Sequence, residues 1–94
     1  MAALNEQEIQ SRLQDANGWT LKAGQINKNY ELPSFHRAVG FVAQIAILAD
    51  VADHHPDIDI RYNRVTLSLS THSENGITEK DFTLAAQIDE APTQ

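Results

Sequence analysis

The chain has 94 residues, a length that suits one domain with one modest core, and its apolar content of 41% is ordinary for a globular protein. Thirteen acidic residues against seven basic ones give a formal net charge of −6, with no run of Lys or Arg. This balance argues against a phosphate backbone or an anionic membrane as a partner. We therefore expect a single domain over residues 1–94 that binds no nucleic acid directly and no membrane.

Cysteine is absent, which excludes a disulfide framework and thiolate chemistry. Residues 1–10 lack the charged and apolar regions of an export signal. No linker rich in Pro, Gly or Ser divides the chain, and no uncharged stretch approaches the length of a transmembrane helix. These features predict a cytoplasmic enzyme or binding protein.

The first third of the chain predicts a short helix followed by a hairpin. Asn5 is a good capping residue, the turn after it is acidic, and apolar residues lie four apart up to Leu13. From Trp19 onward apolar and polar residues alternate, with a turn at Gly24 and a second run that ends at Leu32. We expect Trp19 to be a core residue.

The segment from Ser34 to Asp53 predicts the longest element, a core helix capped by Ser34, because apolar residues recur at spacings of three and four. Its other side includes Ile47 and Val51, which one small sheet cannot cover. We interpret this surface as a subunit interface of a homodimer or homotetramer. Pro56 cannot continue a helix, so the helix ends close to the histidines that precede it.

The chain after this proline predicts a second hairpin, since apolar and polar residues alternate on both sides of a turn. With Asn63 and Arg64 as a two-residue loop, Tyr62 pairs with a core valine and belongs to the core. The same register puts His55 opposite His72, with side chains ~5 Å apart. A three-residue loop would shift this pairing.

Thr78 and Asp81 form a capping-box pattern, with Asp in place of the commoner Glu, which predicts a final helix. It predicts a helix from about Glu79 to Asp89. The order is then helix, hairpin, helix, hairpin, helix. We expect an α+β two-layer domain in which a four-stranded antiparallel sheet carries three helices on one face.

Three of the four histidines, His54, His55 and His72, fall between the long helix and the last one. Histidine gains or loses a proton near neutral pH, so this cluster suggests proton-transfer chemistry. One alternative is capping of the helix C-terminus without chemistry. Another is a metal site completed by Asp50 or Asp53, although adjacent histidines in an extended chain point apart.

The same residues resemble the signature of the pterin-4a-carbinolamine dehydratase family. That signature runs from an acidic residue through a His-His-Pro or related triplet, an aromatic residue and another histidine to a final aspartate, at set spacings. Its positions are filled here by Asp50, His54, His55, Pro56, Tyr62, His72 and Asp81. The flanking segments also look like the family, so the resemblance spans nearly the whole chain. Residues 57–60 depart from it, since they are acidic and aliphatic where some members carry aromatic residues.

The resemblance implies a lyase that dehydrates a 4a-hydroxytetrahydropterin to a quinonoid dihydropterin, in the recycling of tetrahydrobiopterin, without a metal or organic cofactor. It implies that His54, His55 and His72 are catalytic. We assign the acid and base roles to His54 and His72, because a helix C-terminus favours a charged His54, and the orienting role to His55. The implied substrate-binding residues are Asp53, His54, His55, Ser70, Thr71, His72 and Ser73.

Asp81 is the member of the signature that we interpret as structural, because the capping box and the helix dipole already explain an acid there. Some members of the family partner a transcription factor through their helices. A binding or regulatory module is therefore the alternative to an enzyme, and Ile47 and Val51 would serve such a partner as well as a second copy of the chain.

Overall fold

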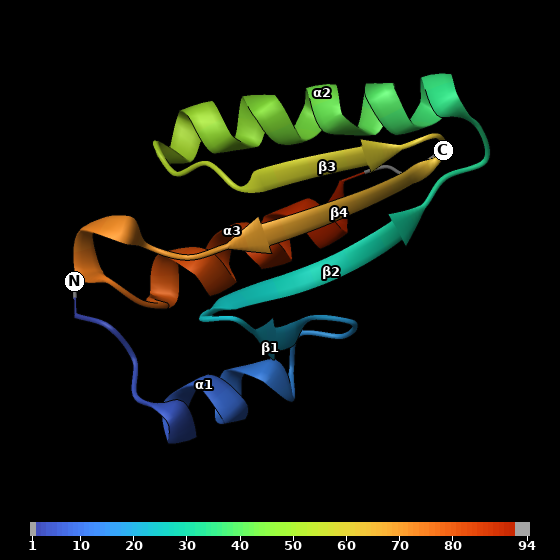
Figure 1. Cartoon of the computed structure of the whole chain (residues 1–94). Helices are drawn as coiled ribbons and strands as arrows, with labels where there is room; N and C mark the ends of the chain where they lie inside the picture. The colour runs from blue at the N-terminus through green and yellow to red at the C-terminus, as the bar shows by residue number, and fades with distance from the viewer. Residues whose placement is uncertain (1, 92–94) are drawn as a thin grey trace.

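The computed structural model describes residues 2–91, so residue 1 and residues 92–94 of the predicted domain lie outside the described residues. Figure 1 shows the order of the elements, which confirms the predicted one. They are α1 (Glu6–Leu13), β1 (Thr20–Lys22), β2 (Gln25–Glu31), α2 (Phe35–Ala52), β3 (Asp57–Arg61), β4 (Arg64–Leu69), the short 3-10 helix η1 (His72–Glu74) and α3 (Glu79–Glu90).

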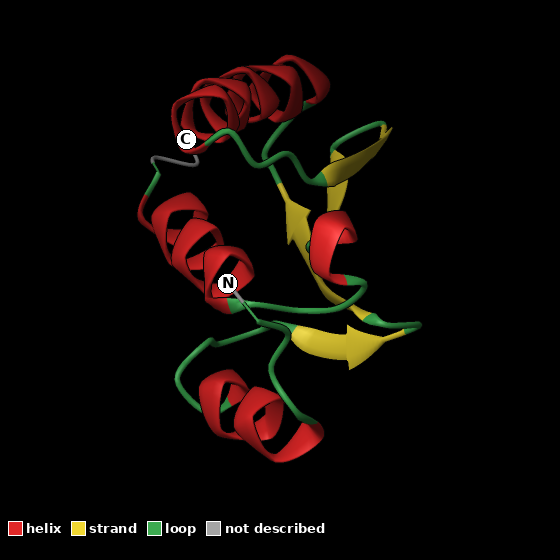
Figure 2. Cartoon of the chain, turned by 90° about the vertical axis from the view of Figure 1, so that its left-hand side faces the viewer, coloured by secondary structure: helices red, strands yellow, loops and turns green. Residues whose placement is uncertain are grey.

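The four strands form one antiparallel sheet in the order β1-β2-β4-β3. The helices α1, α2 and α3 lie on one face of it, as predicted, so the molecule has two layers (Figure 2). Alternation along the strands explains this arrangement, because Ile26, Val65 and Leu67 are fully buried under the helices. The other face is polar, and there the hydroxyl of Thr66 donates to the side-chain oxygen of Asn29 at 2.6 Å.

The helix ends follow the predicted capping residues. Asn5 forms a capping box with Glu8 at the start of α1, and the Ser34 side chain accepts a hydrogen bond from the Arg37 backbone at the start of α2. Trp19 is buried as predicted, and its Nε1 donates to the carboxylate of Asp89 at 2.8 Å. This bond ties the start of the first hairpin to the last turn of α3.

One side of the helix α2 packs into the core, and another side of the same helix is exposed to solvent. Phe41, Ile45 and Ala49 are buried against the sheet, whereas Ile47 is 66% and Val51 84% exposed, as predicted. By length and composition alone, α2 is the one helix in residues 2–91 that could cross a membrane. Its buried side belongs to the core of this domain, so its length and apolar character do not identify a membrane protein.

The predicted register of the second hairpin is wrong by two residues. The loop is Tyr62 and Asn63, so that Arg61 pairs with Arg64 and Ile60 with Val65. Because side chains alternate with a period of two, this shift leaves every apolar residue on the same face, and the pattern alone could not reveal it. Asn63 fixes the turn, since its amide donates to the carbonyl of Leu32 at 2.9 Å.

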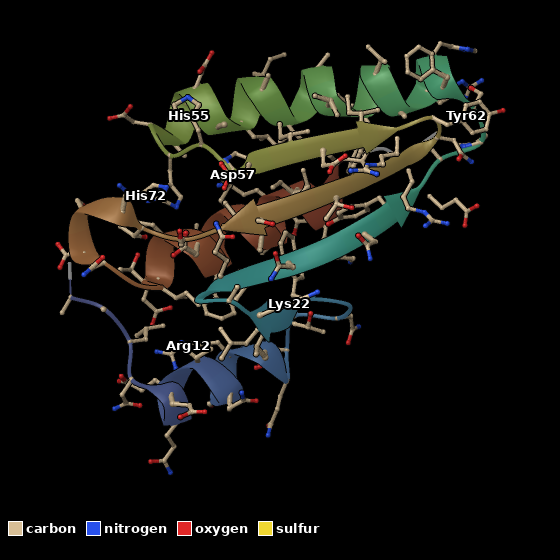
Figure 3. The ribbon with its side chains drawn as sticks, viewed as in Figure 1. Arg12, Lys22, His55, Asp57, Tyr62 and His72 are labelled. Atoms are coloured by element: carbon tan, nitrogen blue, oxygen red, sulfur yellow. The ribbon has the colours of Figure 1, made fainter. Side chains whose placement is uncertain are left out.

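Two predictions fail with this register. His55 does not lie opposite His72, because β3 begins only at Asp57 and His72 belongs to η1. Tyr62 is not a core residue: it occupies the turn with a φ of 54° and is 72% exposed. Figure 3 shows Tyr62 at one end of the molecule and His55 and His72 at the other.

Candidate active site

The two adjacent histidines are positioned by the way α2 ends. Asp53 takes the left-handed conformation, with a φ of 51°, as the C-cap. The backbone N–H of His54 then reaches back to the carbonyl of Ala49 at 3.0 Å. Pro56 keeps His55 extended. The chain therefore leaves the helix with successive side chains on opposite sides, His54 toward α3 and His55 back toward the last turns of α2.

His54 is buried and paired. Its Nε2 lies 2.5 Å from Oδ1 of Asp81, and the exposed fractions of the two side chains are 9% and 0%. Removing a carboxylate from water is costly unless other groups hydrogen-bond to it. Asp81 meets this condition, because its Oδ2 accepts from the Thr78 backbone N–H and from the Thr71 hydroxyl, both at 2.9 Å.

Asp81 thus caps α3, as predicted, and also holds His54. The capping box with Thr78 is complete. The sequence did not predict the contact with His54, because it joins residues 27 positions apart and no local pattern indicates such a pairing. The spacing of the family signature was the only signal that linked the two residues.

The hydrogen bonds of Asp81 also indicate which nitrogen of His54 carries a hydrogen. An ionised carboxylate only accepts hydrogen bonds, so Nε2 of His54 is the donor to it. The neutral ring then has its hydrogen on Nε2, and Nδ1 is left to accept a proton. A paired histidine of this kind can take up and release a proton without losing its orientation.

His55 has a very different partner. Its Nε2 lies 2.9 Å from Oδ1 of Asp50, and the two side chains are 59% and 79% exposed. Water screens such a contact, and it contributes little to stability. Residues 2–91 contain no cluster of three or more His, Cys, Asp or Glu side chains arranged to hold a metal ion.

His72 lies beside an open depression of about 340 Å³. The depression lies between the turn at residues 23–25 and the loop after β4, and Ser70, Thr71 and His72 contribute to its wall. Its volume falls in the range of small-molecule sites, roughly 300–1,000 Å³. Figure 3 shows His55, Asp57 and His72 gathered at this end of the molecule.

The predicted site residues are brought to one end of the sheet, but not all into contact. Asp53 lies on the exposed C-cap of α2, and Ser73 is exposed in η1. His54 borders a separate depression of about 280 Å³, together with Ala52 and Lys80. Within residues 2–91, His54 and His55 are hydrogen-bonded to aspartates and not to each other or to His72.

The fold and this site define a class of protein. A two-layer α+β domain carries a buried His–Asp pair at the end of its sheet, next to further histidines and an open polar depression. This arrangement suits proton transfer to and from a small molecule.

Comparison with known proteins makes the class specific. The family model described as pterin 4 alpha carbinolamine dehydratase matches residues 2–91, and the chain belongs to this family. A Roseiflexus castenholzii protein provisionally named pterin-4-alpha-carbinolamine dehydratase is 58% identical over 89 residues, which cover 95% of this chain and 96% of the relative.

Two solved structures share the fold. The crystal structure of a transcriptional coactivator/pterin dehydratase from Brucella melitensis superposes with a TM-score of 0.88 at 39% identity, over 93% of this chain and 95% of that one. A pterin dehydratase-like RuBisCO assembly factor of the alpha-carboxysome superposes with a TM-score of 0.62 at 21% identity, over 76% and 82% of the two chains. The second likeness concerns the fold alone.

Proposed function

We propose that this chain dehydrates a 4a-hydroxytetrahydropterin to the quinonoid dihydropterin and so recycles a pterin cofactor, with histidines as general acid and base. Membership of the dehydratase family supports the reaction. The observation that carries the assignment of roles is the buried His54–Asp81 pair, because an oriented imidazole is what the proton transfers need.

The reaction removes water across the bond between C4a and N5. The acid protonates the leaving hydroxyl as the C4a–O bond breaks, and the base takes the proton of N5 while the C4a=N5 double bond forms. Two histidines can divide these steps and return to their starting states by exchanging protons with water. We assign the steps to His54 and His72, with His55 as the residue that orients the ring.

The depression beside His72 supports a flat heterocycle as the substrate. Its wall includes Ser70 and Gln25, and the side-chain amide of Gln25 donates to Asp57 at 3.2 Å. Hydroxyl, amide and carboxylate groups match the donors and acceptors around a pterin ring. We place Ser73, which follows His72 in η1, and Asp53, the C-cap of α2, at the edge of the substrate or beside its side chain.

The test is an assay of 4a-hydroxypterin dehydration with His54→Ala and His72→Ala. We expect kcat to fall by about 100-fold or more in each, the usual contribution of a general acid or base. His36→Ala is the matched control, because His36 is exposed at the opposite end of α2. Turnover by the unaltered protein no faster than the uncatalysed reaction would refute the enzyme, and full activity of both variants would refute the site.

We also propose that the exposed face of α2 makes a homodimer or homotetramer. This face carries Val39, Ile47 and Val51, which are all more than 40% exposed. Gly40 lies on the same face, seven and eleven residues before the last two, and nothing within the chain approaches the position of its missing Cβ. A glycine within a helix lowers the stability of the folded state. Close contact with a second helix at this position would explain why glycine is found there.

Sedimentation analysis tests this assembly. Val51→Glu is expected to shift the chain toward the monomer, because it buries a charge in the interface. Gln10→Glu adds the same charge on the exposed α1 and should leave the mass unchanged. A monomeric unaltered chain would contradict self-association and would favour the other role of such a surface, the binding of a different protein, which the name of the Brucella melitensis relative also suggests.

A further inference from the structure

Thr71 follows β4, and its N–H, its carbonyl and its hydroxyl hydrogen all have partners within the chain. The residue is 4% exposed. Its N–H donates to the carbonyl of Gly76 at 2.7 Å, and its own carbonyl accepts from the N–H groups of Glu74 and Gly76 at 3.1 and 3.3 Å. Its hydroxyl donates to Oδ2 of Asp81 at 2.9 Å. Thr71 contributes to the wall of the depression, but a substrate could accept a hydrogen bond from its hydroxyl or its N–H only by displacing one of these partners.

The direction of the hydroxyl hydrogen bonds follows from counting protons. A hydroxyl has one hydrogen, and that of Thr71 points to the carboxylate, which can only accept. Thr78 must therefore be the donor in the 2.8 Å contact between the two hydroxyls. The oxygen of Thr78 in turn accepts from the backbone N–H of Lys80 at 3.2 Å. The chain of donors runs from the first turn of α3 through Thr78 and Thr71 to Asp81.

This series of hydrogen bonds fixes the orientation of the Asp81 carboxylate. Two donors, Thr71 and the backbone of Thr78, hold Oδ2, so that Oδ1 faces the ring of His54. All these groups are buried, and a buried carboxylate keeps its donors because water cannot replace them. Loss of the Thr71 hydroxyl would let the carboxylate rotate and would weaken the hold on His54.

We propose that Thr71, supported by Thr78, is a positioning residue that orients the Asp81 carboxylate and thereby keeps the hydrogen of the neutral His54 ring on Nε2. The proposal rests on the proposed function and deepens it, since it explains how a proton-transfer histidine is held ready. It also revises the role that the family resemblance implies for Thr71. A substrate-binding hydroxyl would face the ligand, whereas this one faces the carboxylate.

The two roles predict different kinetics. Thr71→Val keeps the shape of the side chain and removes the donor, so we expect kcat to fall by about tenfold, the effect of losing one hydrogen bond to a charged group, with KM unchanged. A substrate-binding role predicts the reverse, a raised KM with kcat retained. Thr71→Ser restores the donor and should recover most of the lost kcat.

Thr66→Val is the matched control. Thr66 also donates a hydroxyl hydrogen bond, to Asn29, but on the open polar face of the sheet. The same chemical change is made there, away from His54. We expect this variant to keep the kcat and KM of the unaltered protein.

A spectroscopic measurement separates this proposal from the reaction itself. In the unaltered protein the His54 Nε2–H should give a slowly exchanging ring N–H signal in proton NMR, absent from His54→Ala. Thr71→Val should weaken or remove that signal, and Thr71→Ser should retain it. These results need no turnover, so an inactive chain would refute the proposed function and leave this inference standing.

The inference is overturned by any of three results. One is a Thr71→Val variant that keeps both kcat and the His54 signal. The second is a raised KM at unchanged kcat. The third is a Thr71→Ser variant as impaired as Thr71→Val. If Thr71→Val does not fold, by circular dichroism, Thr71→Ala removes the same donor without added bulk, and the same outcomes apply to it.

Discussion

Two neighbouring histidines of this chain each contact an aspartate, and the two contacts differ in almost every physical respect. The pair of His54 with Asp81 is buried, joins α2 to α3 and is one part of a network with two threonines. The pair of His55 with Asp50 is exposed and lies within one helix end. The same two residue types thus form a rigid site in one place and a solvated contact in the other.

The backbone conformation at the end of α2 decides what each of these two histidines can do. The left-handed Asp53 and the extended segment before Pro56 send successive side chains in opposite directions. Burial then gives His54 a fixed partner, a fixed tautomer and little water. His55 is exposed and its contact with Asp50 is screened by water, which suits contact with a substrate better than an exact proton transfer.

The largest expected difference between the two pairs is in stability. Asp81→Ala removes the cap of α3 and leaves His54, Thr71 and the Thr78 N–H without their acceptor, so we expect a loss of about 3 kcal/mol in the free energy of unfolding. Asp50→Ala should cost no more than about 0.5 kcal/mol, as for other exposed pairs. Urea denaturation of the two variants measures the contrast, and equal losses would show that the two pairs do not differ as described.

A smaller effect on the free energy of unfolding is expected at Asp53, the residue after which the His54 and His55 side chains point in opposite directions. Asp53→Val places a branched side chain in the left-handed region and should cost about 1–2 kcal/mol. Asp53→Gly should leave stability within about 0.5 kcal/mol of the unaltered protein, because relief of strain and a more flexible unfolded chain oppose each other. If Asp53→Val has the same free energy of unfolding as the unaltered protein in this titration, the left-handed conformation of Asp53 does not direct the path of the chain after α2.

Asp89 provides a case between the two pairs, and its contact with Tyr30 makes stability depend on pH only at high pH. It accepts from Lys28 at 2.8 Å and from the Tyr30 hydroxyl at 2.5 Å, and it is 28% exposed. Burial, and then the hydrogen bond to Asp89, raise the pKa of Tyr30 above its ordinary value of 10.0.

The sign of the pH effect follows from this raised pKa. The folded state holds the phenol proton more tightly than the unfolded state, so the contribution of Tyr30 is complete below the ordinary pKa of about 10 and declines as the pH rises beyond it. The stability advantage of the unaltered protein over Tyr30→Phe should therefore shrink between pH 9 and pH 11, measured by denaturation at each pH. A constant advantage would contradict the tight hold on the proton.

Local signals account for what the sequence could predict. Asn5, Ser34 and Thr78 cap the three helices where their patterns placed them, because a cap bonds to residues two or three positions away. The helical spacing of apolar residues likewise predicted the exposed side of α2, and the order of helices and hairpins predicted the two layers. Each of these features depends on spacing within one element or on the order of the elements.

Capping residues and apolar spacing could not predict contacts between segments that are distant in the sequence. The hairpin register depends on Asn63, whose amide bonds to a residue 31 positions earlier, and a shift by two residues leaves the pattern unchanged. The histidine at position 72 was therefore paired with the wrong neighbour. The partner of His54 was likewise hidden, because Asp81 already had a sufficient local role as a helix cap.

We infer that the buried pair, and not the exposed one, prepares the chain for proton transfer. The most direct measurement is the kcat of pterin dehydration in Asp81→Asn and Asp50→Asn, with folding checked by circular dichroism. By analogy with the aspartate of a catalytic triad, whose loss costs about 10⁴-fold in kcat, we predict a loss of at least about 100-fold for Asp81→Asn and less than about threefold for Asp50→Asn. Equal activities of the two folded variants would contradict the account.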